Sequence, residues 1–178
     1  IHKMVEISLN DDLKTVWWPL PTDDDAESWR LRALAWEHPN VMIGGSDAGA
    51  HLDRMAGAPY TTAWLADCLR GRQLTSMENA IRHLTDVPAR LFGFTGRGRI
   101  AEGWHADIVV FDPETVGATD VELVFDLPGG SKRLWSEATG ISRVLVNGVV
   151  SVADGTATGA IAGKVMRAGV DTETVTAS

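Results

Sequence analysis

Apolar residues recur at helical spacing along the first half of the chain. In residues 26–37, Trp29, Ala33 and Trp36 lie three or four positions apart, behind an acidic run that can cap a helix. The pattern predicts one helix there, ended by a proline, and a second helix over residues 61–72.

A third helix is predicted to begin near Thr75. Thr75 and Glu78 have the spacing of a capping box, in which each side chain bonds a backbone N–H of the other residue. Pro88 breaks this helix, and residues 89–92 add one further helical turn before Gly93.

The pattern becomes strand-like in the second half of the chain. Residues 106–113 hold a short apolar run that ends in a turn, which predicts a strand. Asn147-Gly148 separates the apolar runs 141–146 and 149–152, and this dipeptide favours a two-residue type I′ hairpin. A helical half, over about residues 26–93, is thus expected to precede a β half, over about residues 100–168.

The strongest functional signal lies between the first two predicted helices. Residues 41–45 form a continuous apolar run typical of a buried strand, and a polar loop with the sequence SDAGAH follows. Asp47 is therefore expected at the carboxyl end of a buried strand, where α/β barrels carry catalytic groups. Alternatively, the Asp47 carboxylate caps a turn of this loop.

Two more polar residues share this loop. His51 is either a ligand or a solvated side chain. Arg54 either binds a substrate carboxylate through two parallel hydrogen bonds or forms a surface ion pair with Asp53. An acid, an imidazole and a guanidinium thus lie within eight positions of one another.

A complete zinc site is not expected within the chain. Its five histidines form no HxH or HExxH pair, and Cys68 has no CxxC partner. Cys68 lies in a predicted helix, which indicates an inert packed thiol. A single cysteine also excludes an internal disulfide and fits a reducing, cytoplasmic compartment.

Composition and charge exclude two classes of partner. The chain has 178 residues, 44% of them hydrophobic, and a formal net charge of −8, which argues against nucleic-acid binding. No apolar run approaches the roughly 20 residues that a membrane span needs, and the start has no signal-peptide pattern. Because the first residue is not Met, we expect the chain to be a piece of a longer protein.

Five segments in the same order resemble the amidohydrolase superfamily, and within it the D-aminoacylase-like (N-acyl-D-amino-acid deacylase) branch. They are IGGSDAGAH at 43–51, LTDVPARLFG at 84–93, GRIAEGWHADIVVFDP at 98–113, VLVNGVV at 144–150 and GAIAGKVMR at 159–167. Members of this branch carry a longer insert and a His-Pro-Arg after the Ser-Asp motif, which His51 and Arg54 do not reproduce here.

The resemblance implies a fold and a domain division. It implies the last strand and helices of a (β/α)₈ metal-dependent hydrolase barrel, plus part of a small β-sandwich. The barrel portion would span residues 1–98, the sandwich portion residues 99–168, and a flexible tail residues 169–178. In such proteins, strands from the protein's own N-terminus normally complete the sandwich.

The resemblance also implies the chemistry. Asp47 matches the aspartate that binds or faces the metal and transfers the proton, with His51 and Arg54 expected at the substrate. The cofactor would be one or two zinc ions, with most ligands supplied by residues that have no match in this chain.

The implied function is hydrolysis of a non-peptide C–N bond, in an N-acyl (D-)amino acid or a related amide. The alternative is a non-catalytic fragment or small subunit that completes a partner chain. In either case we expect the chain to be inactive alone. We also expect it to associate with the rest of its own protein, a partner chain or a copy of itself, because unpaired strands and bare apolar faces need cover.

Overall fold

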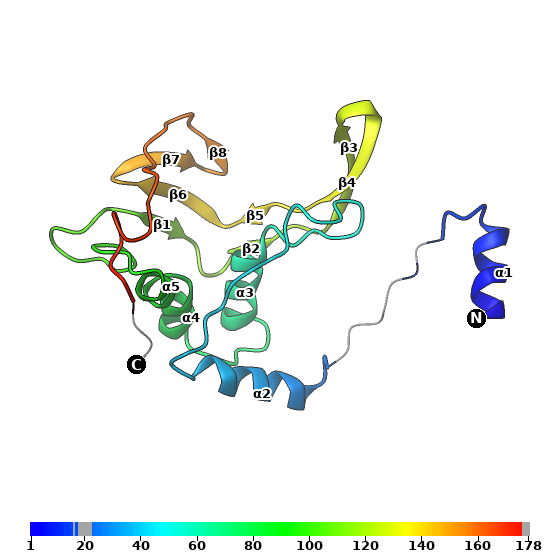
Figure 1. Cartoon of the computed structure of the whole chain (residues 1–178), viewed down its shortest axis with the longest axis horizontal. Helices are drawn as coiled ribbons and strands as arrows, with labels where there is room; N and C mark the ends of the chain where they lie inside the picture. The colour runs from blue at the N-terminus through cyan, green and yellow to red at the C-terminus, as the bar shows by residue number, and fades with distance from the viewer. Residues whose placement is uncertain (16, 18–22, 176–178) are drawn as a thin grey trace. The chain divides into compact units, whose positions relative to one another are not determined.

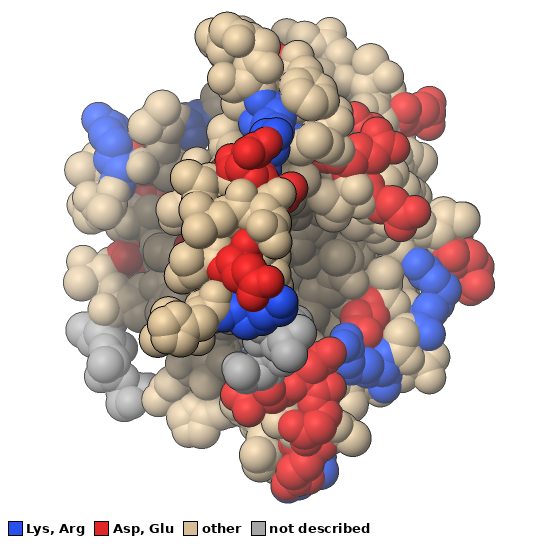
Figure 2. Space-filling view, turned by 90° about the vertical axis from the view of Figure 1, so that its right-hand side faces the viewer, with Lys and Arg blue, Asp and Glu red and all other residues tan. Residues whose placement is uncertain are grey.

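The computed structural model describes residues 1–15, 17 and 23–175 and shows a mixed α/β chain (Figure 1). The chain divides into two compact units, Ile1–Arg32 and Ala33–Ser178. None of the described helices combines the length and hydrophobicity that crossing a membrane requires. On the face seen in Figure 2, acidic side chains are spread widely and basic ones lie among them.

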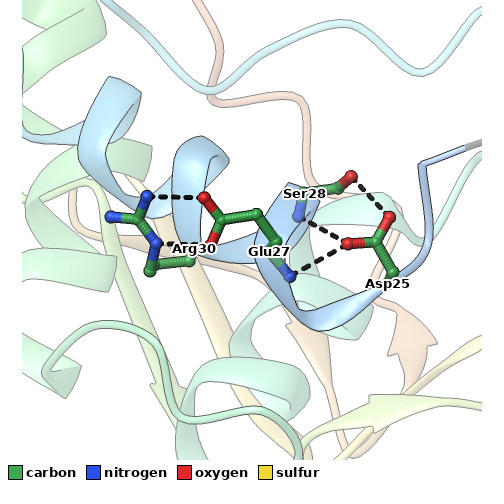
Figure 3. Close-up of polar contacts among 4 residues, drawn as sticks. All are labelled: Asp25, Glu27, Ser28 and Arg30. Carbon is green, nitrogen blue, oxygen red and sulfur yellow. Dashed lines mark hydrogen bonds and ion pairs between the residues drawn. The ribbon is translucent and has the colours of Figure 1, made fainter.

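The first unit holds α1 (His2–Asn10) and the start of α2 (Ala26–Trp36). The predicted cap of α2 is confirmed at Asp25, whose carboxylate accepts hydrogen bonds from the backbone N–H groups of Glu27 and Ser28 at 3.0 Å and from the Ser28 hydroxyl at 2.7 Å (Figure 3). The Ser28 hydrogen bonds lower the pKa of Asp25. Arg30 donates two hydrogen bonds to Glu27 on the same helix.

The predicted helices of the second unit form with shifted ends. They are α3 (Tyr60–Leu69), α4 (Met77–Leu84) and α5 (Asp86–Leu91). The cap of α4 is Ser76, one residue later than predicted, because the Ser76 hydroxyl accepts the Asn79 N–H at 3.2 Å. Thr75 instead accepts a hydrogen bond from the Asn79 side chain at 2.8 Å.

Three small antiparallel sheets make up the β half. The strands are β1 (Ile108–Phe111), β2 (Gly117–Ala118), β3 (Glu122–Leu127), β4 (Ser131–Trp135), β5 (Ala138–Thr139), β6 (Ile141–Val146), β7 (Val149–Ala153) and β8 (Thr156–Ala157). One sheet has the order β1-β6-β7-β8, while β2 pairs with β5 and β3 with β4. The predicted hairpin is confirmed, since Asn147 and Gly148 both have positive φ, at 48° and 80°, as a type I′ turn requires.

The core joins α3 and α4 to the β half. Leu65 and Cys68 of α3 pack with Ala80 of α4 and with Val116, just before β2. Arg70 donates hydrogen bonds from its guanidinium to the carbonyl oxygens of Pro113 and Val116. The packed position predicted for Cys68 is confirmed, and burial raises the pKa of its thiol to about 11.

The predicted strand at residues 41–45 does not form. This segment is irregular, with Val41, Met42 and Ile43 only half-buried. A strand needs a neighbouring strand to satisfy its N–H and C=O groups, and no described segment pairs with this one. Within the described residues every strand pairing is antiparallel, so the barrel and sandwich remain predictions.

The described part of the predicted tail touches the helical half. Thr172 forms an isolated bridge with Phe94, and the Glu173 N–H donates to the Gly93 carbonyl at 2.8 Å. Gly93 has a φ of +66°, and a Cβ there would lie 2.1 Å from the Glu173 carbonyl oxygen. Residues 176–178 lie outside the described part of the chain.

Candidate functional site

The three candidate residues lie on one closed loop, residues 46–57, here called the Asp47 loop. Its two ends meet, because a Cβ built on Gly57 would lie only 2.4 Å from the Ser46 carbonyl oxygen. Only glycine permits this approach. A compact loop of this length with its ends together is an Ω-loop, a type that frequently carries function.

Asp47 lies at an exposed turn of this loop. Its backbone has a left-handed φ of 49°, and its carbonyl accepts the Ala50 N–H at 3.0 Å. The side chain that bonds the local backbone belongs to Ser46, whose hydroxyl accepts the Ala48 N–H at 3.1 Å. Within the described part of the chain, the Asp47 carboxylate has no hydrogen-bond partner. The expected position at a strand end is therefore wrong, because the strand before it is absent.

His51 and Arg54 are also exposed on the same loop. His51 repeats the geometry of Asp47, with a φ of 47° and a carbonyl that accepts the N–H groups of Arg54 at 2.8 Å and Met55 at 3.0 Å. Arg54 forms the surface ion pair with Asp53, with Nε 3.4 Å from Oδ2 and both side chains half exposed. Such pairs contribute little to stability, so Arg54 can exchange Asp53 for another anion at small cost.

The described residues do not fit a metal centre by themselves. They contain no group of three or more His, Cys, Asp or Glu side chains arranged to hold an ion. A zinc site generally needs at least three protein ligands, and Asp47 supplies only one. The assignment of Asp47 as a metal ligand therefore stays a prediction.

One buried titratable residue escaped sequence reasoning. His83 of α4 is 1% exposed, and neither of its ring nitrogens has a hydrogen-bond partner, nor does the buried Nε1 of Trp64. The two rings stand edge to face with centroids 6.2 Å apart. Burial, and to a smaller degree the nearby Arg82 charge, lowers the pKa of His83. Its place three residues after Ala80, on the same helix face, is the signal that could have predicted this burial.

Residues 4–152 match the model of the amidohydrolase family, a range that contains the Asp47 loop, the helices α2–α5 and the Asn-Gly hairpin. The chain belongs to the amidohydrolase family. The resemblance found in its motifs is thus confirmed.

Three relatives of the chain are D-aminoacylase-like, and all of them are from Alcaligenes xylosoxydans xylosoxydans. The chain is 36% identical to an N-acyl-D-glutamate deacylase over 64% of its length and 22% of the relative's. It is 38% identical to an N-acyl-D-aspartate deacylase, over 70% and 23% of the two chains, and 35% identical to a D-aminoacylase, over 71% and 24%. The chain therefore spans about a quarter of the length of the curated relatives that it matches.

A solved structure also aligns with the chain. It is N-acyl-D-glutamate deacylase from Bordetella bronchiseptica, complexed with zinc and a phosphonate inhibitor that mimics the tetrahedral intermediate. The identity is 31%, over 74% of this chain and 26% of that chain, with a TM-score of 0.47. A superposition this loose does not establish a common fold, so family membership rests on the sequence matches.

Proposed function

We propose that this chain is part of an amidohydrolase that hydrolyses the amide bond of an N-acyl-D-amino acid. The observation that carries the proposal is the match, at 35–38% identity, to three relatives named for the same reaction on D-glutamate, D-aspartate and other D-amino acids. The family model matches residues 4–152, a range that includes the Asp47 loop, and we place the chemistry on this loop.

Asp47 is the proposed proton carrier of this reaction. Water adds to the amide carbonyl carbon, its proton passes to the Asp47 carboxylate, and the proton then moves to the nitrogen as the C–N bond breaks. The products are a carboxylic acid and a D-amino acid. An exposed carboxylate with no partner within the described residues is free to accept and return a proton.

Two further assignments belong to the same proposal. Arg54 would hold the substrate carboxylate, since its present partner Asp53 is an exposed surface acid, and His51 would lie beside it on the loop. Zinc stays a proposal for the complete enzyme. Any zinc there would depend mainly on residues other than those described, because they gather no metal-ligand cluster.

The test is turnover by the complete enzyme and by its Asp47→Asn variant. N-acetyl-D-glutamate, N-acetyl-D-aspartate and N-acetyl-D-methionine are supplied with their L-enantiomers as controls, and the released amine is measured. We expect D-selective hydrolysis, and a loss of roughly 10²–10⁴-fold in kcat for Asp47→Asn with unchanged circular dichroism. The chain alone should be inactive.

Two outcomes would overturn parts of this proposal separately. Absence of turnover on every N-acyl amino acid would remove the function and favour a non-catalytic subunit. Full activity of Asp47→Asn would leave the function in place and remove Asp47 from the proton-transfer role.

A further inference from the structure

Among the described residues, one backbone hydrogen bond links the Asp47 loop to the β half. The Leu134 N–H of β4 donates to the Leu52 carbonyl at 2.8 Å. Leu52 is the residue directly after His51, and it lies midway between Asp47 and the base of the loop at Gly57. This contact therefore holds the far side of the loop, while the approach of Gly57 to Ser46 closes its base.

The geometry of β4 shows that this hydrogen bond is separate from the ribbon's own ladder. Leu134 lies opposite Leu123 of β3. In an antiparallel pair, opposed residues either exchange both hydrogen bonds or direct their N–H and C=O groups to the outside. Because the Leu134 N–H reaches Leu52, it points to the outer edge of the ribbon.

The β3–β4 ribbon continues at its base into the β2–β5 pair, which begins directly after the core residue Val116. It extends away from the four-stranded sheet (Figure 1). At its base the buried Ser136 donates its hydroxyl to the Thr119 carbonyl at 2.8 Å, and Glu137 and Thr119 exchange two further bonds at 2.9 Å. Along the ribbon, Arg133 pairs with Asp126 and stacks over the Trp135 ring at 4.1 Å. The ribbon can thus hold the loop in a fixed position.

The loop needs such a support because two of its residues adopt unfavourable backbone conformations. Asp47 and His51 both have left-handed φ values, near 50°. Each such residue costs on the order of 1 kcal/mol and persists only where its surroundings hold it. These are two of the three residues assigned to the chemistry. Loss of the hydrogen bond from Leu134 would therefore let the loop relax and move the Asp47 carboxylate.

We propose that the β3–β4 ribbon is the positioning element of the Asp47 loop, and that the Leu134 backbone N–H is the group through which it acts. This inference rests on the proposed function. Leu134 is a positioning residue: it touches the loop backbone and makes no contact with the reacting atoms. Proteins hold reactive groups most accurately when a second set of residues locks them in place.

The test compares two substitutions at one position in the complete enzyme. Leu134→Pro removes the N–H and leaves the pairing with β3, because that N–H points away from β3. Leu134→Ala removes the side chain and keeps the N–H, so it is the matched control. We expect the proline variant to lose at least tenfold in kcat with KM changed less than threefold, since small misplacements of a reacting group cost this much. The alanine variant should stay within threefold of wild type in both constants.

Partial unfolding of a variant would lower its apparent kcat and leave KM unchanged, so kcat is calculated per folded molecule, with the folded fraction measured by circular dichroism at the assay temperature. Equal kcat values for the proline and alanine variants would overturn the inference. If the proline variant does not fold, hydrogen exchange of the wild-type enzyme at the Leu134 amide decides. Slow exchange supports the contact, whereas exchange at the rate of a free amide contradicts it.

The same experiments distinguish this inference from the proposed function. If the wild-type enzyme has no deacylase activity, the proposed function is wrong, and the proposed role of the ribbon in catalysis is wrong with it. If Asp47→Asn abolishes activity and Leu134→Pro leaves it intact, the proposed function stands and only the positioning role is wrong.

Discussion

At the scale of single residues, His83 links the stability of the fold to pH. Its imidazole is buried without a hydrogen-bond partner, and burial lowers its pKa from the ordinary value of 6.5. Between the folded and unfolded pKa values, His83 is therefore neutral in the folded chain and protonated in the unfolded chain. The stability that depends on neutral His83 is complete above about pH 6.5 and is lost as the pH falls toward the folded pKa.

This predicts a stability loss on mild acidification that one substitution removes. Between pH 7 and pH 5 the wild-type unfolding midpoint should fall, while that of His83→Gln should change little. The exposed His2 gives a matched control, and His2→Gln should behave as wild type. Thermal unfolding at each pH measures the effect, and identical pH profiles for His83→Gln and wild type would contradict it. The lowered carboxylate pKa values of Asp25 and Asp107 act only at lower pH.

At the scale of elements, the tip of the β6–β7 hairpin holds three segments together. The Asn147 side chain accepts a hydrogen bond from Arg97 at 2.9 Å and donates one to the Ala162 carbonyl at 2.6 Å. Its backbone N–H donates to Asp107 at 2.8 Å, and Arg97 also pairs with that carboxylate. These bonds from Asn147 and Arg97 help to lower the pKa of Asp107 against the opposing effect of its burial.

Substitution of Asn147 should separate its two contributions. Asn147→Ala loses both side-chain bonds and places alanine, which tolerates the left-handed region less well than asparagine, at a φ of 48°, so we expect a loss of about 2–3 kcal/mol of unfolding free energy. Asn147→Gly loses the same bonds but tolerates this φ, so it should cost about 1 kcal/mol less. Urea unfolding measures both variants. Equal losses would mean that the turn conformation is not under strain in the alanine variant.

At the scale of the whole molecule, the chain buries few apolar side chains and exposes many. The buried hydrophobic residues of the described part are Leu65, Cys68, Ala80, Ala89 and Val116. Large apolar residues such as Phe125, at 67% exposure, and Ile161, at 99%, face outward. Exposed apolar surface of this extent is typical of an interaction surface.

The chain alone is therefore expected to associate. Light scattering across a range of concentrations should give a mass that rises above 19.2 kDa, because each copy can cover apolar surface on another. Addition of the remaining part of the enzyme should replace self-association by a defined complex. A monomer that stays stable at every concentration would contradict this prediction.

Local patterns were enough to predict the elements that depend on neighbouring residues. The acidic cap before α2, the Asn-Gly turn between β6 and β7, and the packed Cys68 of α3 were all predicted correctly. The cap and the turn depend on residues within a few positions, where hydrogen bonds are determined by the chain itself. Cys68 was placed correctly from its position in a predicted helix, although its packing partners Ala80 and Val116 are remote. The order of five motifs also indicated the family, which the match over residues 4–152 confirms.

Contacts between distant segments could be decided only by the tertiary structure. The apolar run at 41–45 has the composition of a buried strand, yet it is irregular because strand hydrogen bonds must come from another segment. The burial of His83 against Trp64 and the bond between Leu52 and Leu134 join residues far apart in the sequence. The sequence alone determined which side chains are available for chemistry, whereas the packing of remote segments decided where the Asp47 loop is held.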